Sequence, residues 1–371
     1  MRESTASAAP DREIADLAGQ VIAGGRLDAD QLSALARAGG QSPWVLLHWA
    51  ARVRTLWFGN AVRLCAIVPG KLGGCTEDCS WCGQSGVCAD GAEKPAVTTT
   101  GEIVAAARVA GRWGAGCFGI INSGRRPSAR DLAAVAEAVD AINETSDPPA
   151  GDSGFSDPAS GSVDRHRAPH LCASLGELTD DQAKALAAAG ITRYNHNLET
   201  SRRFFGHVVS THSYDDRLAT LDAAKRAGLE LCCGGIFGMG ETWQDRVDLA
   251  VTLRDRVGPR IVPMNFLNPI PGTPLANTQP LAAIEVLVIV AVFRLAMPTT
   301  DLMIAGGRES NLRSLQSWVF HAGATSCISG NYLTTEGQPA AADLTMLADL
   351  GLRVVDELPA RGFLAGPAST A

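Results

Sequence analysis

The sequence lacks a strongly basic segment, a secretory signal and a long hydrophobic run. Its 371 residues have a formal net charge of −7, and its basic runs are no longer than two residues, as at Arg125 and Arg126. Phosphate binding needs a basic face, so a nucleic-acid partner is disfavoured. The first residues contain no apolar segment of the kind found in secretory signals. We therefore expect a cytoplasmic protein.

Hydrophobic runs long enough for a bilayer are also missing. The most apolar stretch, residues 281–297, is interrupted by Glu285 and Arg294 and is too short to span a membrane. We expect it to form a buried amphipathic helix. The glycines of GGIFGMGET lack the spacing and the lysine of a phosphate-binding loop, so we expect them to allow close approach of a ligand or of backbone.

Cysteine, in contrast, is abundant, with ten residues. Since we find no secretory signal, this number does not suggest a disulfide framework. It indicates buried thiols, a metal site, or both.

The alternation of apolar patterns predicts the fold. We expect residues 1–10 to be disordered, 11–60 to form an N-terminal helical cap, 61–356 to form a barrel and 357–371 to form a C-terminal tail. Helical patterns follow eight strand-like runs, which are residues 62–68, 117–122, 170–174, 193–197, 230–237, 261–267, 302–305 and 325–329. Eight such repeats predict an α/β fold, a (β/α)8 barrel of the TIM type, with a doubly wound open sheet as the alternative. Residues 143–169, rich in Asp, Ser, Gly and Pro, are expected to be a flexible insertion.

The strongest local motif is GGCTEDCSWCGQS, in which Cys75, Cys79 and Cys82 have the spacing C-x3-C-x2-C. Three thiolates on one tight loop can hold three irons of a [4Fe-4S] cluster and leave the fourth iron open. The alternative is a structural zinc loop, which needs four ligands and would have to recruit Cys88. The three-residue spacing favours the iron-sulfur cluster.

Three further cysteines, Cys117, Cys172 and Cys232, lie on three separate predicted strands. Each one alone could be a small buried hydrophobic residue. A closed barrel, however, would bring all three together in its lumen, next to the cluster loop. We therefore predict that they form a second cluster site.

Polar residues also lie on predicted barrel strands. Asn195, Asn197 and Glu199 are two positions apart and should face the same side. Barrel interiors are normally filled by apolar side chains, so these residues and Asn265 are candidates for ligand contacts. Arg217 begins a helix and could reach a carboxylate at the barrel mouth, although a surface ion pair is equally compatible with its position.

From about residue 17 to 352, the sequence resembles the biotin synthases, a family of radical S-adenosylmethionine (SAM) enzymes. The resemblance lies in the cluster loop and in YNHNLETS, CCGGIFGMGET, MNFLNPIPGTPL and AGGRES, which occur in family order. The C-x3-C-x2-C loop is common to radical SAM enzymes, whereas YNHNLET followed by GGIFGMGET is much more specific.

The resemblance implies a sulfurtransferase that inserts sulfur into dethiobiotin to form biotin, the last step of biotin biosynthesis. It implies a SAM-binding [4Fe-4S] cluster on Cys75, Cys79 and Cys82, and an auxiliary cluster, usually [2Fe-2S], that donates sulfur. The matching auxiliary ligands are Cys117, Cys172 and Cys232. The residues that match SAM contacts are Trp81, Asn197, Glu199 and Arg217, and those that match dethiobiotin contacts are Asn195 and Asn265. Related enzymes are homodimers, and a reducing donor such as flavodoxin or ferredoxin is expected.

The sequence departs from the family at one ligand. The auxiliary cluster usually has an arginine as its fourth ligand, and Met303 occupies that position; Arg308 aligns with a different family arginine. The fourth position could be open, held by Met303 or taken by another group such as Cys233. Because neighbouring strand residues point to opposite faces, outward packing of Cys233 is the simpler interpretation. The sequence assigns no role to the remaining cysteines, Cys65, Cys88 and Cys327.

Other radical SAM enzymes could share this scaffold, for example a mutase similar to methylornithine synthase or a cluster-maturation enzyme. Such enzymes need no sulfur donor. The three cysteines on separate strands therefore favour the biotin synthase interpretation over these alternatives.

Overall fold

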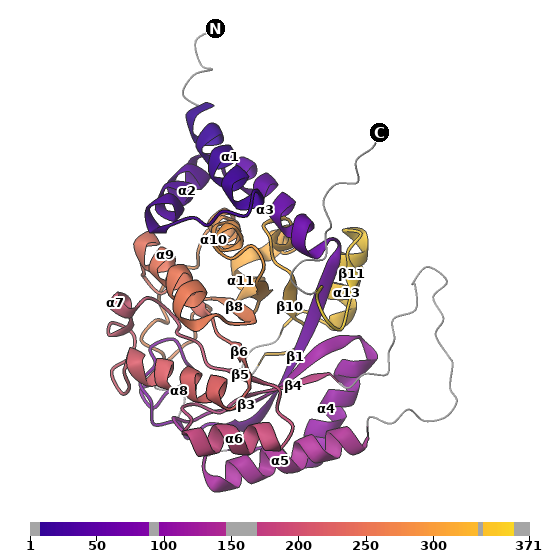
Figure 1. The fold of residues 1–371 in the computed structure, drawn as a ribbon. Helices are drawn as coiled ribbons and strands as arrows, with labels where there is room; N and C mark the ends of the chain where they lie inside the picture. Colours follow the sequence, from indigo (N-terminus) through magenta and orange to yellow (C-terminus); the bar gives the residue numbers. More distant parts are fainter. Residues whose placement is uncertain (1–7, 89–95, 146–168, 333–336, 360–371) are drawn as a thin grey trace, which may run out of the picture.

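Eight parallel strands close the barrel, and we call each of them a stave; the fifth stave is made of two short strands in succession. The computed structural model describes residues 8–88, 96–145, 169–332 and 337–359. The staves are, in order, β1 (Ala61–Leu72), β3 (Ala115–Asn122), β4 (His170–Ser174), β5 (Arg193–Asn195), β6 (Glu230–Cys232) continued by β7 (Gly235–Phe237), β8 (Ile261–Phe266), β9 (Asp301–Ile304) and β10 (Ser326–Ile328). The last stave, β10, pairs in parallel with β1 and closes the sheet. The predicted (β/α)8 barrel is confirmed, and the open-sheet alternative is wrong (Figure 1).

One stave is interrupted. The single strand predicted over 230–237 is divided into β6 and β7 by Cys233 and Gly234. A Cβ atom at Gly234 would lie 1.9 Å from the carbonyl oxygen of Pro263, and one at Gly235 would lie 2.5 Å from that of Glu199. These two glycines are therefore required for close packing of backbone against backbone.

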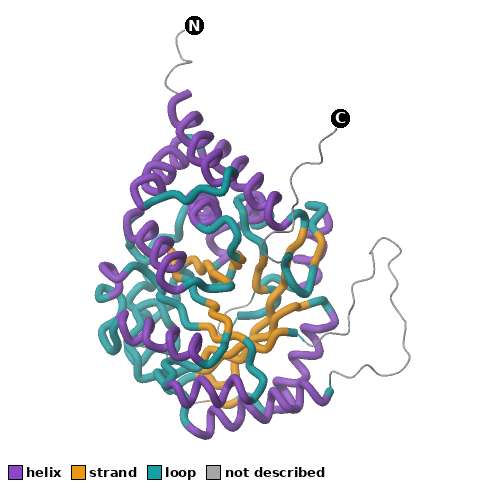
Figure 2. The backbone as a smooth tube through the Cα atoms, viewed as in Figure 1, coloured by secondary structure: helices purple, strands orange, loops and turns teal. Residues whose placement is uncertain are grey.

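Helices alternate with the staves and cover the barrel (Figure 2). Five of them begin with a capping box, in which a Ser or Thr side chain accepts a hydrogen bond from the third helical N–H group. These are α4 (Thr100–Arg112), α5 (Ala129–Glu144), α6 (Asp180–Ala188), α8 (Tyr214–Arg226) and α9 (Trp243–Thr252). The other elements around the barrel are α7 (Arg202–Phe205), η1 (Leu253–Val257), α10 (Ala283–Ala296), α11 (Arg308–Leu312), η2 (Arg313–Leu315), α12 (Trp318–His321), α13 (Ala340–Asp349), β2 (Ala96–Val97) and β11 (Arg353–Val354).

Three N-terminal helices pack on one side of the barrel's helical layer. They are α1 (Ala8–Ile22), α2 (Ala29–Gln41) and α3 (Pro43–Phe58); α2 contacts α9 and α10, and α3 contacts α10. In Figure 1 they lie together at the top of the view. Helix α1 begins at Ala8, inside the segment 1–10 that was expected to be disordered. The physical reason is that alanine favours helix and proline is tolerated in a first turn.

Helix α10 corrects the expectation for residues 281–297. All its residues except Ile284 and Glu285 are buried, so it is not amphipathic. The barrel covers one side of α10, and α2 and α3 cover another. Apolar side chains on all sides of this helix are therefore shielded from water. Within the described ranges, no helix has both the length and the hydrophobicity needed to span a membrane.

Three of the expected irregular segments lie largely beyond the described residues. Residues 146–168, which make up most of the expected insertion 143–169, belong to this group, as do 1–7 and residues 360–371 of the expected tail. Helix α5 continues to Glu144, so the insertion begins later than position 143.

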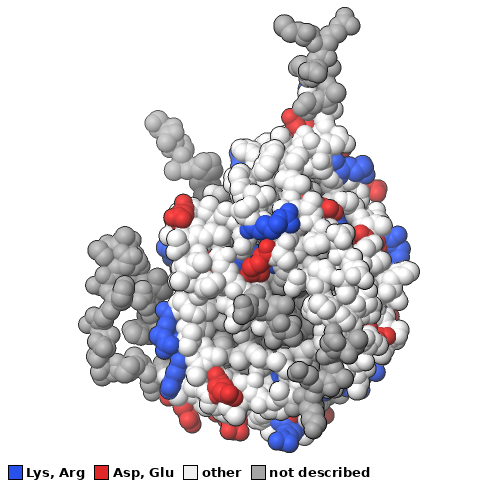
Figure 3. All heavy atoms as spheres, turned by 180° about the vertical axis from the view of Figure 1, so that it is seen from behind, with Lys and Arg blue, Asp and Glu red and all other residues white. Residues whose placement is uncertain are grey.

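Figure 3 shows one face of the molecule, on which basic and acidic side chains are interspersed among uncharged ones. Among the residues that the structure describes, this face shows no continuous basic surface. Its charge distribution therefore gives no support for binding a polyphosphate backbone there.

A buried ion pair connects α13 to the barrel. Arg308 Nη2 donates a hydrogen bond to Asp343 Oδ2 at 3.1 Å, and both side chains are fully buried. Asp343 also accepts hydrogen bonds from Ser329 Oγ at 2.7 Å and from Gln338 Nε2 at 2.9 Å. The guanidinium of Arg308 is therefore engaged by Asp343 of α13. This agrees with the expectation that Arg308 does not substitute for the family's arginine, whose position Met303 occupies.

We predict that Asp343→Ala lowers the free energy of unfolding by about 3 kcal/mol or more, because it leaves the buried Arg308 guanidinium with Glu309 as its one carboxylate partner among the described residues. The matched control is Asp222→Ala, which breaks an exposed ion pair with Arg256 and should cost less than about 1 kcal/mol. Urea denaturation of the apoprotein measures both values. Equal losses in the two variants would contradict the prediction.

Candidate active site

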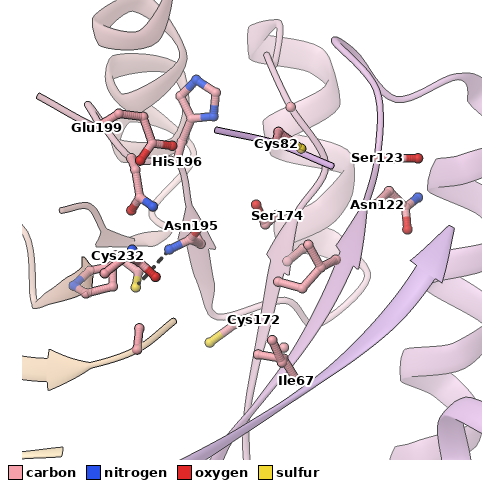
Figure 4. A pocket seen from close by; sticks show the side chains of 18 of the residues that line it. Ile67, Cys82, Asn122, Ser123, Cys172, Ser174, Asn195, His196, Glu199 and Cys232 are labelled. Atoms are coloured by element: carbon pink, nitrogen blue, oxygen red, sulfur yellow. Dashed lines mark hydrogen bonds between the residues drawn. The ribbon is translucent and has the colours of Figure 1, made fainter. Parts of the chain in front are cut away.

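A cavity of about 360 Å³ extends from the barrel lumen to the loops that follow β1, β3, β4 and β5. This is the end of a (β/α)8 barrel at which enzymes place their active sites. Figure 4 shows side chains from several staves directed into it. The structure brings all the predicted site residues to its wall, namely Cys75, Cys79, Trp81, Cys82, Cys117, Cys172, Asn195, Asn197, Glu199, Arg217, Cys232, Asn265 and Met303.

The three motif cysteines lie on the loop that directly follows β1. Cys82 Sγ accepts a hydrogen bond from the backbone N–H of Gln84 at 3.4 Å, an interaction that stabilises a thiolate. Burial raises the pKa of Cys79 to about 12, so a thiolate there needs a compensating positive charge such as iron. These features fit an iron-sulfur cluster.

A zinc site finds little support in the same region. Cys88, the fourth ligand that zinc would require, lies with its Sγ 3.9 Å from the carbonyl oxygen of Pro271 and does not line the cavity. Ligands of one zinc ion must surround one point, whereas those of a cluster are spread over several irons.

Asp78, between two of the motif cysteines, ties this loop to a distant segment. Its carboxylate accepts hydrogen bonds from the backbone N–H of Ser210 at 2.9 Å and from Thr211 Oγ1 at 3.0 Å. Although burial acts to raise the pKa of Asp78, the hydrogen bonds from Ser210 and Thr211 outweigh it and lower the pKa to about 2. The carboxylate is therefore ionised at neutral pH and holds the loop with charge-assisted bonds.

A second connection runs from the cluster loop to the polar segment after β5. Glu77 accepts a hydrogen bond from His212 Nδ1, and His212 Nε2 accepts one from Arg217 Nε at 3.0 Å. This arrangement requires the neutral tautomer with a proton on Nδ1, and burial lowers the pKa of His212 accordingly. Arg217 Nη1 then donates to the carbonyl oxygen of Asn197 at 2.7 Å and lies 3.5 Å from Glu199 Oε1.

Glu199 has the features of a ligand-binding residue. Its φ of 67° lies in the left-handed region, which is unfavourable for a glutamate and is often found at functional sites. Burial raises the pKa of Glu199, and the charge of Arg217 opposes this shift. Its Oε2 atom is buried and has no hydrogen-bond partner among the described residues. A buried carboxylate oxygen of this kind needs a donor, which a bound ligand can provide.

The strand cysteines lie deeper in the lumen. Cys117 Sγ and Cys172 Sγ are 2.9 Å apart, and Asn195 Nδ2 donates to Cys232 Sγ at 3.2 Å. Figure 4 shows Cys172 and Cys232 on facing sides of the same cavity. Together with Cys65, Met303 and several aliphatic side chains they form a buried group inside the barrel, which we call the lumen cluster and whose members are Cys65, Cys117, Cys172, Cys232, Ile261, Met303, Ala305 and Ile328.

Cys233 is not part of the lumen cluster. It is fully buried in the main hydrophobic core, and its N–H donates to the carbonyl oxygen of Ile261 at 3.0 Å. This position agrees with the interpretation that Cys233 packs outward, away from the three strand cysteines.

The side-chain amide of Asn265 forms hydrogen bonds with two backbone groups. Its Nδ2 donates to the carbonyl oxygen of Gly235 at 3.2 Å, and its Oδ1 accepts from the N–H of Gly306 at 3.0 Å. The amide therefore holds β7 to the segment after β9 and keeps one N–H for a ligand in the cavity.

Sequence reasoning missed several residues of the site. Glu77, His212, Arg193 and Cys65 all line the cavity, but none was predicted. Glu77 lies within the cluster motif, so its polarity could have been a signal. His212 and Arg193 carry no local pattern that distinguishes them from surface residues.

Comparisons with known proteins agree with this geometry. Residues 71–253 match the family model of the radical SAM superfamily, and residues 263–353 match the model of the biotin and thiamin synthesis associated domain. The biotin synthase of Trichlorobacter lovleyi is 44% identical over 349 residues, which are 94% of this chain and 98% of that protein. The chain belongs to the biotin synthase family. The biotin synthase of Geobacter metallireducens is 42% identical over 344 residues, 92% of this chain and 98% of that protein.

Solved structures show the same fold at lower identity. The [FeFe]-hydrogenase maturase HydG from Carboxydothermus hydrogenoformans has a TM-score of 0.74 and 17% identity, and the match covers 93% of this chain and 80% of that chain. Methylornithine synthase has a TM-score of 0.71 and 19% identity, covering 93% and 97%. At these identities the likeness concerns the fold alone, and the sequence relatives decide the family.

We predict that Asp78→Ala makes the cluster loop release iron faster. Charge-assisted hydrogen bonds contribute about 1.5–3 kcal/mol each, so the rate of iron loss to a chelator should rise about tenfold or more. Asp215→Ala is the matched control, because it removes an exposed carboxylate paired with Arg202 outside the loop. If both variants keep iron as the unmodified protein does, Asp78 does not hold the loop.

Proposed function

We propose that this member of the biotin synthase family is a radical SAM sulfurtransferase that converts dethiobiotin to biotin. The observation that carries the proposal is the presence of two groups of thiols at two depths of one cavity. A radical SAM enzyme needs the group on the loop. A reaction that uses a second cluster, as sulfur insertion does, accounts for the group in the lumen.

We assign the SAM-binding [4Fe-4S] cluster to Cys75, Cys79 and Cys82. We assign the auxiliary iron-sulfur cluster to Cys117, Cys172 and Cys232. When bound, the first cluster with SAM supplies the means to remove hydrogen from unactivated carbon, and the auxiliary cluster supplies sulfur.

The protein's own side chains would position SAM between these groups. Arg217 is held by His212 and Asn197 and offers a buried positive charge, which suits a carboxylate. The unpaired Oε2 of Glu199 suits the hydroxyl groups of a ribose. Trp81, on the cluster loop, provides an apolar wall of the same cavity.

Dethiobiotin would lie near the strand cysteines. Its ureido group has both hydrogen-bond donors and acceptors, which match the side-chain amides of Asn195 and Asn265. Aliphatic side chains such as Ile261 and Ile328 line the lumen and exclude water, and this protects a reactive carbon centre from side reactions.

We also propose a homodimer that works in the cytoplasm and receives electrons from a donor such as flavodoxin or ferredoxin. All ten cysteines are free thiols in the structure, which suits a reducing compartment. The dimer and the electron donor rest on the resemblance to the family.

We predict that Cys79→Ala abolishes SAM cleavage, because two thiolates cannot hold the site-differentiated cluster on the loop. Formation of 5′-deoxyadenosine after anaerobic reconstitution is the measurement. The control is Cys327→Ala, which removes a thiol of the main hydrophobic core outside the lumen cluster. This variant should retain SAM cleavage. Wild-type yield from Cys79→Ala would rule out the loop assignment.

We predict that Cys172→Ala separates the two activities. Its side chain is remote from the loop in sequence and belongs to the lumen cluster, so SAM cleavage should continue at a reduced rate while biotin formation stops. Both products can be quantified from one reaction by mass spectrometry. Normal biotin formation by this variant would contradict the auxiliary-site assignment.

A further inference from the structure

A fourth cysteine faces the three strand cysteines in the lumen. Cys65 lies on β1, directly opposite Cys117 of β3 in the parallel register. Both side chains line the same cavity, and Cys117 Sγ is 2.9 Å from Cys172 Sγ. Cys65 is buried in the lumen cluster, which also contains Cys232. Four thiols from β1, β3, β4 and β6 thus surround the same interior space.

The other candidates for a fourth ligand are less suitable. Met303 lies in the lumen cluster, but its thioether is neutral and a weak acceptor. Cys233 and Cys327 are buried in the main core outside the lumen, and Arg308 is paired with Asp343. Within the ranges that the structure describes, Cys65 is the remaining thiol of the lumen cluster.

The position of Cys65 suits a replacement for the family's arginine. The sheet order places β10 between β9 and β1, so Met303 and Cys65 approach the lumen from staves on either side of one strand. A ligand on β1 can therefore serve the same interior space from a nearby direction.

Two buried arginines lie where they could compensate the negative charge that a fourth thiolate would add to the auxiliary site. A fourth thiolate in place of a guanidinium makes the ligand set more negative, and charges of this kind must be compensated in a dry interior. Arg193 Nη1 lies 3.6 Å from Cys117 Sγ and 3.7 Å from Cys172 Sγ, and its Nη2 pairs with Glu230. Arg63, two residues before Cys65, pairs with Asp301 at 2.5 Å.

Both arginines also retain an unused donor. The Nε atoms of Arg193 and Arg63 are buried and find no acceptor among the described residues. Leaving such a donor without a partner costs about 1–3 kcal/mol, so an acceptor is expected nearby. The thiolates and sulfides of a cluster would be acceptors of the required sign.

We propose that Cys65 is the fourth protein ligand of the auxiliary cluster, in place of the family's arginine, and that Arg193 is a positioning residue that compensates the added negative charge. The inference rests on the proposed function, since it presupposes the cluster on Cys117, Cys172 and Cys232. Each of the four thiols gives up its proton when it binds iron. An all-cysteine ligand set is the consequence.

The test compares the full-length protein with its Cys65→Ser and Cys233→Ser variants after anaerobic reconstitution. Mössbauer and resonance Raman spectra, with iron and sulfide analysis, report on the auxiliary cluster. Cys65→Ser should lose the auxiliary iron or show the altered spectrum of an oxygen ligand. Cys233→Ser should match the unmodified protein. Formation of 5′-deoxyadenosine from SAM shows that the variants fold and that the loop cluster is present.

Two further variants sharpen the result. Cys65→Ser combined with Met303→Arg restores the family's arginine and should recover auxiliary iron that Cys65→Ser alone has lost or bound differently. Arg193→Gln should retain the cluster but lower its reduction potential, because loss of a positive charge disfavours uptake of an electron. An unchanged potential would remove Arg193 from the proposal.

The outcomes separate this inference from the proposed function. If the auxiliary spectrum is unchanged in Cys65→Ser but lost in Cys172→Ala, Cys65 is not a ligand while the auxiliary site stands. If Cys172→Ala also leaves all spectra unchanged, the auxiliary-site assignment itself fails. Loss or alteration in both variants, with Cys233→Ser unaffected, supports the all-cysteine site.

Discussion

Pairing of β10 with β1 is the interaction on which the site depends. It closes the sheet, and only a closed sheet brings side chains from β1, β3, β4 and β6 into one interior. In an open sheet the same thiols would be spread along one face. Closure also buries the charged groups of the interior, and each of them then needs a partner. Arg193 lies beside the thiols of Cys117 and Cys172, and Arg63 pairs with Asp301. The lumen cluster is thus a product of register and closure together.

The mouth of the barrel is organised by long-range hydrogen bonds from the cluster loop. Asp78 binds the segment at Ser210, and Glu77 is connected through His212 to Arg217. The same arginine contacts the carbonyl oxygen of Asn197 and approaches Glu199. The loop that would hold one cluster and the segment after β5 that would hold SAM are consequently positioned by one connected network. A ligand bound between them would contact groups whose orientation is already fixed.

The fold and much of the site were predictable, because strand periodicity and the C-x3-C-x2-C spacing are local properties of the sequence. The lumen position of Cys117, Cys172 and Cys232 followed from the barrel prediction. Cys65 also lies on a predicted strand, residues 62–68, but its place in the lumen was missed; the register of β1 against β3 sets it opposite Cys117. The partnership of Glu77 with His212 joins residues distant in sequence and leaves no local pattern. Likewise, α10 was expected to be amphipathic, since a sequence does not reveal that α2 and α3 cover its outer side.

The central claim is that one cavity couples SAM cleavage at the loop to sulfur donation in the lumen. Its most direct test is a single-turnover reaction of protein reconstituted with ³⁴S-sulfide, supplied anaerobically with SAM, a reductant and dethiobiotin. Mass spectrometry of the product then decides. The account predicts biotin that carries ³⁴S, with 5′-deoxyadenosine as the co-product. Formation of 5′-deoxyadenosine without biotin, or biotin without the label, would contradict it.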